Sequence, residues 1–364
     1  MPTAKRPWHP GKATFSVSYK ILPTLPQLRH HLAIPTINTG RQINFRGMIF
    51  DDLEGLHAIR DEQGYTRLLS GLEFFMQAYR GQTREHKSCL PLLGRLKTHE
   101  EQLLALCRNI AFEDAISDHP FVQLAEKSAF RGHPLLVDKE GLAQHYGLST
   151  HMIDFTSNFE IASFFATCAL DPKTHRYLPL SDHQHDGMIY RITPVCLHDP
   201  ATTPDRAFGP FHIVGWQPLP RPEQQRAFAV KMKHGQSLCE LPAVERFPFR
   251  QRAKISHRIW KAFDEGRALF PPDAAEELAA QANTLSRFTR TQIDRAWQRL
   301  EEWTGAGFEP EQRHAIEKQS NINETTATIL TWDGLDVETD KNLLSQKLAE
   351  ILNRSRVRLS AYAK

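Results

Sequence analysis

The sequence predicts an α+β protein with a mixed sheet core, flanking helices and an α-helical C-terminal extension. Strand-like runs occur at 15–21, 187–192, 211–216 and 228–232. Apolar residues instead repeat at helical spacing over 99–112, and only helical patterns follow residue 273. We therefore divide the chain into a basic N-terminal arm and lead-in at 1–69, a central domain at 70–272 and a helical extension at 273–364.

The N-terminal arm is basic although the whole chain carries a net charge of only +3. Its first 50 residues contain no Asp or Glu and seven Lys or Arg. Clustered cations gain free energy by releasing counterions from phosphate, so the arm suggests contact with a polyanion. A solvated arm, or one docked on the protein's own acidic face, fits the same composition.

Capping residues place two short helices in the central domain. Asp138 is a candidate N-cap for a helix that Gly147 ends, and Asn158 is a candidate N-cap for the next helix. A longer helix is expected at 255–269. The extension is expected to form four helices, at 274–284, 290–303, 309–319 and 339–354.

Four short motifs follow one another in a fixed order in the central domain. They are Tyr79-Arg80-Gly81-Gln82, Gln144-His145-Tyr146-Gly147, Asp154-Phe155-Thr156-Ser157 and Phe164-Phe165-Ala166. In this order they resemble the FRG domain family, and the resemblance covers roughly residues 70–272. Motif by motif, that family looks similar to the Arg-Ser-Glu class of ADP-ribosyltransferases. The resemblance implies an ADP-ribosyltransferase-like sheet core and NAD as a substrate.

The first and third motifs are implied to bind NAD. A guanidinium holds phosphate or ribose oxygens with a planar fork that Lys lacks, so Arg80 is the candidate for that task; a structural ion pair is the alternative. Thr156 and Ser157 precede a helix N-terminus, where they would position Arg80 or a ribose, or simply cap the helix. The implied NAD-binding set is Tyr79, Arg80, Gly81, Gln82, Tyr146, Thr156, Ser157 and Phe165.

Catalytic roles are expected for Arg80, His145, Asp154 and Gln224. His145 would orient a ribose hydroxyl or act as a general base, and Asp154 would orient His145 or Arg80. A structural histidine and a turn-capping aspartate remain the alternatives. The family's late Gln-x-Gly-x-Phe pattern aligns with Gln224, with Arg226 in place of Gly. Because glutamine carries no charge to stabilise an oxocarbenium ion, Glu223 and Glu240 remain candidates beside it.

A basic and aromatic stretch near the end of the central domain suggests nucleic-acid binding. Residues 246–261 hold six Lys or Arg and no acid, interleaved with Phe247, Phe249 and Trp260. Such a surface can stack bases and neutralise phosphates. Aromatic residues that face the core, with the cations in water, are the alternative. The candidate binding residues are Arg246, Arg250, Arg252, Lys254 and Arg258.

The sequence and the family resemblance therefore favour transfer of ADP-ribose from NAD to RNA, DNA or protein. By analogy, the chain would be a bacterial toxin or anti-phage effector whose helical extension contacts an antitoxin or chaperone. An NAD glycohydrolase, or a non-catalytic module that binds nucleic acid or protein, are the alternatives. A nuclease that binds a metal through His183 and His185 is a more distant one, because no third ligand accompanies that pair.

The cytoplasm is the expected location. No apolar run approaches the ~18 to 20 residues that a membrane helix needs, and the N-terminus lacks the apolar region of a secretory signal. The five cysteines are scattered and form no C-x-x-C pair, which favours a reducing compartment over a disulfide framework.

Overall fold

The computed structural model describes residues 22–357 apart from gaps at 33–35, 38–42, 46–47, 51–55, 61–62, 71–76, 182–185, 194–210, 242, 333–334 and 336. The strand expected at 15–21 and the pair His183 and His185 lie outside the described residues. So does most of the basic arm.

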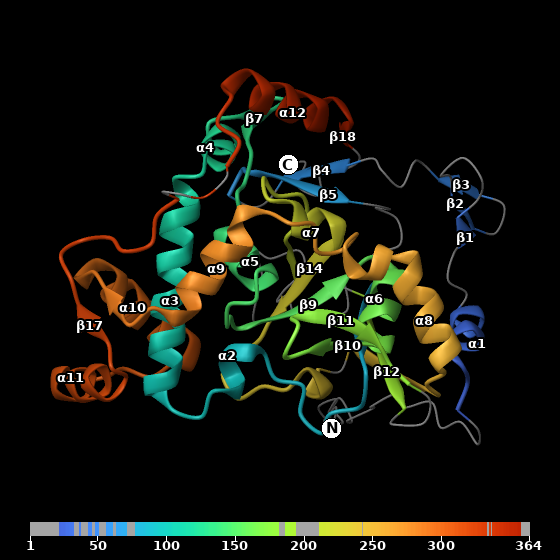
Figure 1. The fold of residues 1–364 in the computed structure, drawn as a ribbon, viewed down its shortest axis with the longest axis horizontal. Helices are drawn as coiled ribbons and strands as arrows, with labels where there is room; N and C mark the ends of the chain where they lie inside the picture. Colours follow the sequence, from blue (N-terminus) through green and yellow to red (C-terminus); the bar gives the residue numbers. More distant parts are fainter. Residues whose placement is uncertain are drawn as a thin grey trace, which may run out of the picture.

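A six-stranded sheet forms the centre of the fold (Figure 1), with the strand order β13-β14-β9-β6-β12-β15. Its strands are β6 (Ala78–Gln82), β9 (Met152–Thr156), β12 (Gly187–Ile192), β13 (Phe211–Ile213), β14 (Ala227–Lys231) and β15 (Val244–Phe249). Every neighbouring pair is antiparallel. The predicted α+β class is confirmed. The sheet was expected to mix parallel and antiparallel strands, but its neighbouring strands are all antiparallel.

Twelve α-helices lie within the described ranges. They are α1 (Leu25–His31), α2 (Leu92–Arg95), α3 (His99–Ser117), α4 (Pro120–Glu126), α5 (Lys139–His145), α6 (Phe159–Thr167), α7 (Pro220–Gln224), α8 (Ala253–Ala262), α9 (Ala274–Thr284), α10 (Arg290–Thr304), α11 (Pro310–Gln319) and α12 (Lys341–Asn353).

Short strands form five smaller sheets. They are β1 (Thr36–Ile37) with β2 (Ile43–Phe45) and β3 (Met48–Phe50); β4 (Leu56–Arg60) with β5 (Thr66–Ser70) and β18 (Ser355–Val357); β7 (Ala129–Phe130) with β8 (His133–Pro134); β10 (Cys168–Asp171) with β11 (Arg176–Pro179); and β16 (Arg287–Phe288) with β17 (Asn323–Glu324).

The expected helix caps are confirmed. Asp138 is the N-cap of α5, and its Oδ1 accepts a hydrogen bond from Gly141 N at 2.9 Å. Gly147, at φ +85°, follows the end of this helix. Asn158 Oδ1 accepts from Glu160 N at 2.8 Å and begins α6. The helix expected to reach 269 instead ends at 262, because a 3₁₀ turn with Glu265 at φ +60° follows it.

The two faces of the sheet carry separate cores, as the alternation of side chains along a strand requires. On β12, Met188 and Tyr190 are buried with Phe155 and Phe228 on one face. Ile189, between them, faces the other side, where α6 and α8 cover the sheet.

Three of the C-terminal helices, α9, α10 and α11, pack on α3, whereas α12 packs on α4 (Figure 1). Trp297 of α10 is fully buried in the same core as Phe112 of α3. Arg299 donates to the Glu113 carboxylate through Nη1 at 2.6 Å and Nη2 at 2.7 Å. This core thus draws on residues from both sides of the expected boundary at 272, which remains a prediction.

Gly81 of β6 lies directly against the backbone of α6. A Cβ atom there would lie 1.8 Å from Ala162 O and 2.7 Å from Ala166 N. Both contacts are with backbone atoms, so no side chain can rotate away. Because residue 81 has no side chain, α6 can pack directly on β6, the strand that carries Arg80.

We expect Gly81→Ala to destabilise the fold by about 3 kcal/mol or more, because α6 must move to admit the methyl group. The free energy of unfolding in urea measures this. Gly307→Ala is the matched control: its Cβ would meet nothing within 4 Å. It should change stability by less than about 1 kcal/mol. Equal stabilities for the two variants would contradict the close contact at Gly81.

His119 should make stability fall between neutral pH and pH 5. It is buried beside Trp332, with ring centroids 4.9 Å apart, and burial lowers its pKa from 6.5 to about 4. The unfolded chain therefore binds more protons than the folded chain between these values, and stability is lost as pH falls from about 6.5 towards 4. One such group contributes up to about 2 kcal/mol between pH 7 and pH 5.

Urea unfolding at both pH values, compared with His119→Asn, measures this contribution. Asn retains a good helix N-cap, and Nδ1 of His119 accepts from Phe121 N at the start of α4. The variant should lose stability less steeply over this range than the unmodified chain. An identical pH dependence in both proteins would show that His119 titrates normally.

Candidate functional site

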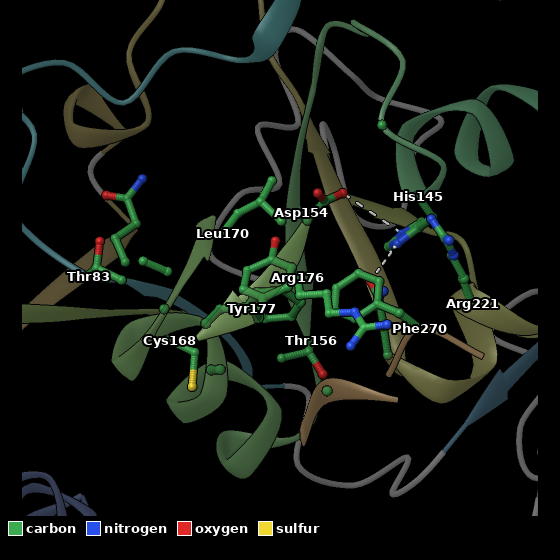
Figure 2. A pocket seen from close by; sticks show the side chains of 18 of the residues that line it. Thr83, His145, Asp154, Thr156, Cys168, Leu170, Arg176, Tyr177, Arg221 and Phe270 are labelled. Atoms are coloured by element: carbon green, nitrogen blue, oxygen red, sulfur yellow. Dashed lines mark hydrogen bonds and ion pairs between the residues drawn. The ribbon is translucent and has the colours of Figure 1, made fainter. Parts of the chain in front are cut away.

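A cavity of about 1320 Å³ opens beside β6 and β9 (Figure 2). It brings together all four motifs in full or in part. Of the residues predicted for the site, Tyr79, Arg80, Gly81, Gln82, His145, Tyr146, Asp154, Thr156 and Phe165 line it. Ser157 and Gln224 do not.

Strands β6 and β9 part where the cavity begins. They share one residue pair, Tyr79 with Thr156. Beyond it, Arg80 Nη1 donates to the backbone oxygen of Asp154 at 2.9 Å. Nε of Arg80 is buried without a hydrogen-bond partner in the described chain. The guanidinium is thus anchored at one nitrogen and keeps donor capacity for a ligand.

The turn between β9 and α6 places Thr156 at the cavity wall. Its Oγ1 accepts from Asn158 N at 3.1 Å, so the hydroxyl supports the start of α6. Ser157 does not line the cavity, and its backbone N donates to Arg226 O at 3.3 Å. Of the two hydroxyl residues expected to meet NAD, only Thr156 is positioned to do so.

A directed chain of hydrogen bonds holds Asp154. Met152 N donates to Thr150 Oγ1 at 3.1 Å, and the Thr150 hydroxyl donates to Gln144 Oε1. Gln144 Nε2 then donates to Asp154 Oδ2 at 2.9 Å. The other carboxylate oxygen, Oδ1, is buried and has no hydrogen-bond partner in the described chain.

A second amide determines the tautomer of His145. Gln225 Nε2 donates to Leu269 O at 3.1 Å, so Oε1 of Gln225 is the atom that faces His145 Nδ1 at 2.9 Å. An oxygen there can only accept, so neutral His145 carries its proton on Nδ1. Nε2 is therefore an unprotonated acceptor, 3.8 Å from Asp154 Oδ1. Figure 2 shows the two side chains facing each other.

Gln225, not Gln224, is the glutamine of the late motif that reaches the cavity. Gln224 is the last residue of α7 and is exposed. Arg226 then adopts φ +48°, a left-handed conformation that glycine takes without strain. The glycine of the family pattern would fit this conformation, which Arg226 adopts here.

Neither glutamate considered for the late acidic position lines the cavity. Glu223 forms an ion pair with Arg354. Glu240 Oε2 accepts from Ser237 N at 3.2 Å in a capping box. The acids in the wall are Asp154, Glu265 and Glu276.

Arginines outnumber acids in the cavity wall. Five of them line it. Arg221 pairs with Glu276 at 2.7 Å, and Arg267 pairs with Asp264 at 2.6 Å. The other three, Arg80, Arg95 and Arg176, form no ion pair with any described residue. Arg95 is anchored only by Nε, which donates to Leu90 O at 3.0 Å. The cavity therefore favours an anionic ligand.

An aromatic wall lies at the same end as His145 and Arg221 (Figure 2). Tyr177 and Phe270 stack with ring centroids 5.0 Å apart and planes at 14°. Arg221 lies over Phe270 at 5.6 Å and over Tyr146 at 4.6 Å. Burial, followed by the charge of Asp154, raises the pKa of Tyr177 to about 12, so this phenol stays neutral. Such a wall can stack a planar ring.

Sequence reasoning missed most of this wall. Phe270 belongs to a Phe-Pro-Pro-Asp segment at the expected end of the central domain, which was a usable signal. No pattern in the sequence pointed to Tyr177 or Arg221, because these residues reach the cavity only through tertiary packing.

The stretch considered for nucleic-acid binding lies on β15 and α8. Phe247 and Phe249 are buried beneath the sheet, as the alternative interpretation held, and Trp260 Nε1 donates to Tyr177 O at 2.8 Å. Arg246 pairs with Glu85. The remaining cations, Arg250, Arg252, Lys254 and Arg258, are exposed. A phosphate-binding surface remains a prediction there, but Phe247 and Phe249 are not available for base stacking.

No group of three or more potential metal ligands occurs in the part of the chain that the structure describes. In the same ranges, none of the helices is both long and apolar enough to cross a membrane.

No curated protein and no solved structure was found to match this chain. The sequence model of the FRG domain matches residues 76–175. This range includes the first motif, His145, Asp154 and all of α6. The chain therefore carries an FRG domain over residues 76–175.

Proposed function

We propose that the protein is an NAD-dependent ADP-ribosyltransferase that modifies a macromolecule. The observation that carries the proposal is the convergence of Arg80, His145, Asp154 and Thr156 in one cavity. These residues come from three separate segments, and the motif resemblance had selected each of them. The cavity volume lies just above the usual range of about 300–1,000 Å³ for small-molecule sites, as an extended dinucleotide would require.

The charge of the wall suits the diphosphate of NAD. Arg80 and Arg95 line the same cavity, and neither forms an ion pair with a described acid. Each guanidinium is held by a backbone carbonyl and retains further N–H groups. Planar N–H pairs bind phosphate oxygens in two-point contacts, which is the role that arginine fills better than lysine.

Asp154 is the best-placed acid for the developing positive charge. Cleavage of the bond between nicotinamide and ribose passes through an oxocarbenium-like state, which a fixed carboxylate stabilises. Gln144 holds Oδ2 of Asp154, and Oδ1 stays unpaired. Glu265 and Glu276 already pair with Lys261 and Arg221. Asp154 thus replaces Gln224, Glu223 and Glu240 as our candidate for the acidic group.

The proposed step transfers ADP-ribose without a redox change. The C1′–N bond breaks, and nicotinamide leaves as a neutral molecule with the bonding electrons. An acceptor hydroxyl or amino group bonds to C1′ through its oxygen or nitrogen. The new bond leaves a positive charge on that atom, which then releases its proton to water. If water is the acceptor, the same site is an NAD glycohydrolase, and free ADP-ribose is the product.

An ADP-ribosyltransferase-like architecture, a role as toxin or anti-phage effector and a contact with an antitoxin or chaperone belong to the same proposal. Lys254 and Arg258 of α8, and Arg252 immediately before the helix, are exposed cations. They favour a nucleic acid among the possible acceptors. The C-terminal helices would serve the contact with an antitoxin or chaperone.

Arg80→Ala should reduce NAD turnover by at least about 100-fold, the usual cost of losing a fixed cationic or hydrogen-bond donor at a reacting centre. Arg80→Lys should restore only a small part of it, because Lys keeps the charge but not the planar fork. Purified protein is incubated with NAD labelled in its adenylate half and with mixed RNA, DNA and protein. The label follows ADP-ribose into its product, and released nicotinamide is measured separately in the same mixture.

Arg287→Ala is the matched control, since Arg287 is exposed and does not line the cavity. Urea unfolding of each variant separates lost activity from lost structure. Label in one polymer supports transfer, and label only in free ADP-ribose supports hydrolysis. Absence of nicotinamide release by the unmodified chain, or full activity of a folded Arg80→Ala protein, would contradict the proposal.

A further inference from the structure

When His145 is neutral, two hydrogen-bond acceptors face each other in the cavity wall with no donor between them. They are Nε2 of His145 and Oδ1 of Asp154, 3.8 Å apart, which is too far for a direct hydrogen bond. Both atoms are buried without a partner in the described chain. The His145 side chain is only 2 % exposed, so water reaches this nitrogen only by way of the cavity.

The protein itself enforces this arrangement. Gln225 fixes the proton of neutral His145 on Nδ1, and Gln144 occupies the other oxygen of Asp154. Both amides are anchored at their far ends, Gln225 by Leu269 O and Gln144 by the Thr150 hydroxyl. Neither amide can rotate to place an N–H between the acceptors without breaking those bonds.

Leaving two buried acceptors unpaired costs about 1–3 kcal/mol each, unless a ligand supplies the donors. A complementary ligand presents two O–H donors side by side. The adjacent hydroxyls of a cis-diol lie roughly one hydrogen-bond length apart, so each can donate to one of the two atoms. An anionic group beside them would meet Arg80, which donates to the backbone oxygen of Asp154.

We infer that His145 Nε2 and Asp154 Oδ1 form a subsite for the cis-diol of a ribosyl phosphate, and that Gln225 is the residue that positions His145 for it. The inference rests on the proposed function only for the identity of the whole nucleotide. The subsite follows from the acceptors, their separation and the amides that orient them.

Binding of ribose 5-phosphate and 2-deoxyribose 5-phosphate to the full chain tests the subsite without any turnover. The probes differ by one hydroxyl, and neither contains the bond that the proposed reaction cleaves. In protein labelled with ¹⁵N at histidine, the His145 signals, assigned by their loss in His145→Ala, report both tautomer and binding. We expect an Nδ1–H tautomer in the free protein and at least about tenfold weaker binding of the deoxy probe.

Gln225→Leu should let His145 sample both tautomers and bring the ratio of the two affinities towards one. Gln225→Glu keeps an acceptor for Nδ1–H, so it should retain the tautomer and the discrimination. Gln224→Leu, a change at the exposed neighbour outside the cavity, should leave both unchanged. Asp154→Ala should also abolish the discrimination while His145 keeps its tautomer.

Four results would overturn the inference: an Nε2–H tautomer in the free protein, equal or absent binding of the two probes, undiminished discrimination in folded Asp154→Ala, or nicotinamide alone shifting the His145 signals as ribose 5-phosphate does. The last would assign the acceptors to a carboxamide. Probe discrimination without NAD turnover would instead leave the subsite standing and remove only the proposed function.

Discussion

The site depends on the separation of two neighbouring strands in the middle of the sheet. Antiparallel neighbours normally satisfy each other's backbone groups along their length. Here β6 and β9 share only the pair Tyr79 and Thr156, and then part. The Arg80 side chain donates a hydrogen bond to the Asp154 carbonyl. One hydrogen bond thus bridges the strands, orients the guanidinium and ties it to the residue whose carboxylate faces His145.

Packing beside this separation explains the glycine of the first motif. Gly81 lets the backbone of α6 lie against β6, so the helix that follows Thr156 is pressed onto the strand that carries Arg80. Asn158 caps that helix, and the Thr156 hydroxyl supports the cap. The same contacts that stabilise the helix therefore set the distance between the two motifs, so fold and site are not separable here.

The sequence predicted contiguous features well and tertiary ones poorly. Caps at Asp138 and Asn158 were predictable because capping is local. So were Arg80 and Asp154, because each lies in a compact motif. Gln224 was predicted because the family's Gln-x-Gly-x-Phe pattern aligns with it. Adjacent residues at a helix end point in directions about 100° apart, and the alignment does not say which of them faces inward. The aromatic wall was not predictable, because its rings come from separate elements.

The wall of the cavity is chemically polarised, and its polarity follows from how the protein uses its own donors. The Thr150 hydroxyl and both amides donate to other protein atoms, so the chain of bonds ends in acceptors at Asp154 and His145. Arg80 and Arg95 supply donors and positive charge that no described acid neutralises. A ligand that fits both parts donates hydrogen bonds at one point and carries negative charge at another. A sugar joined to a phosphate has this pattern, whereas a purely anionic ligand would face the Asp154 carboxylate at the cost of repulsion.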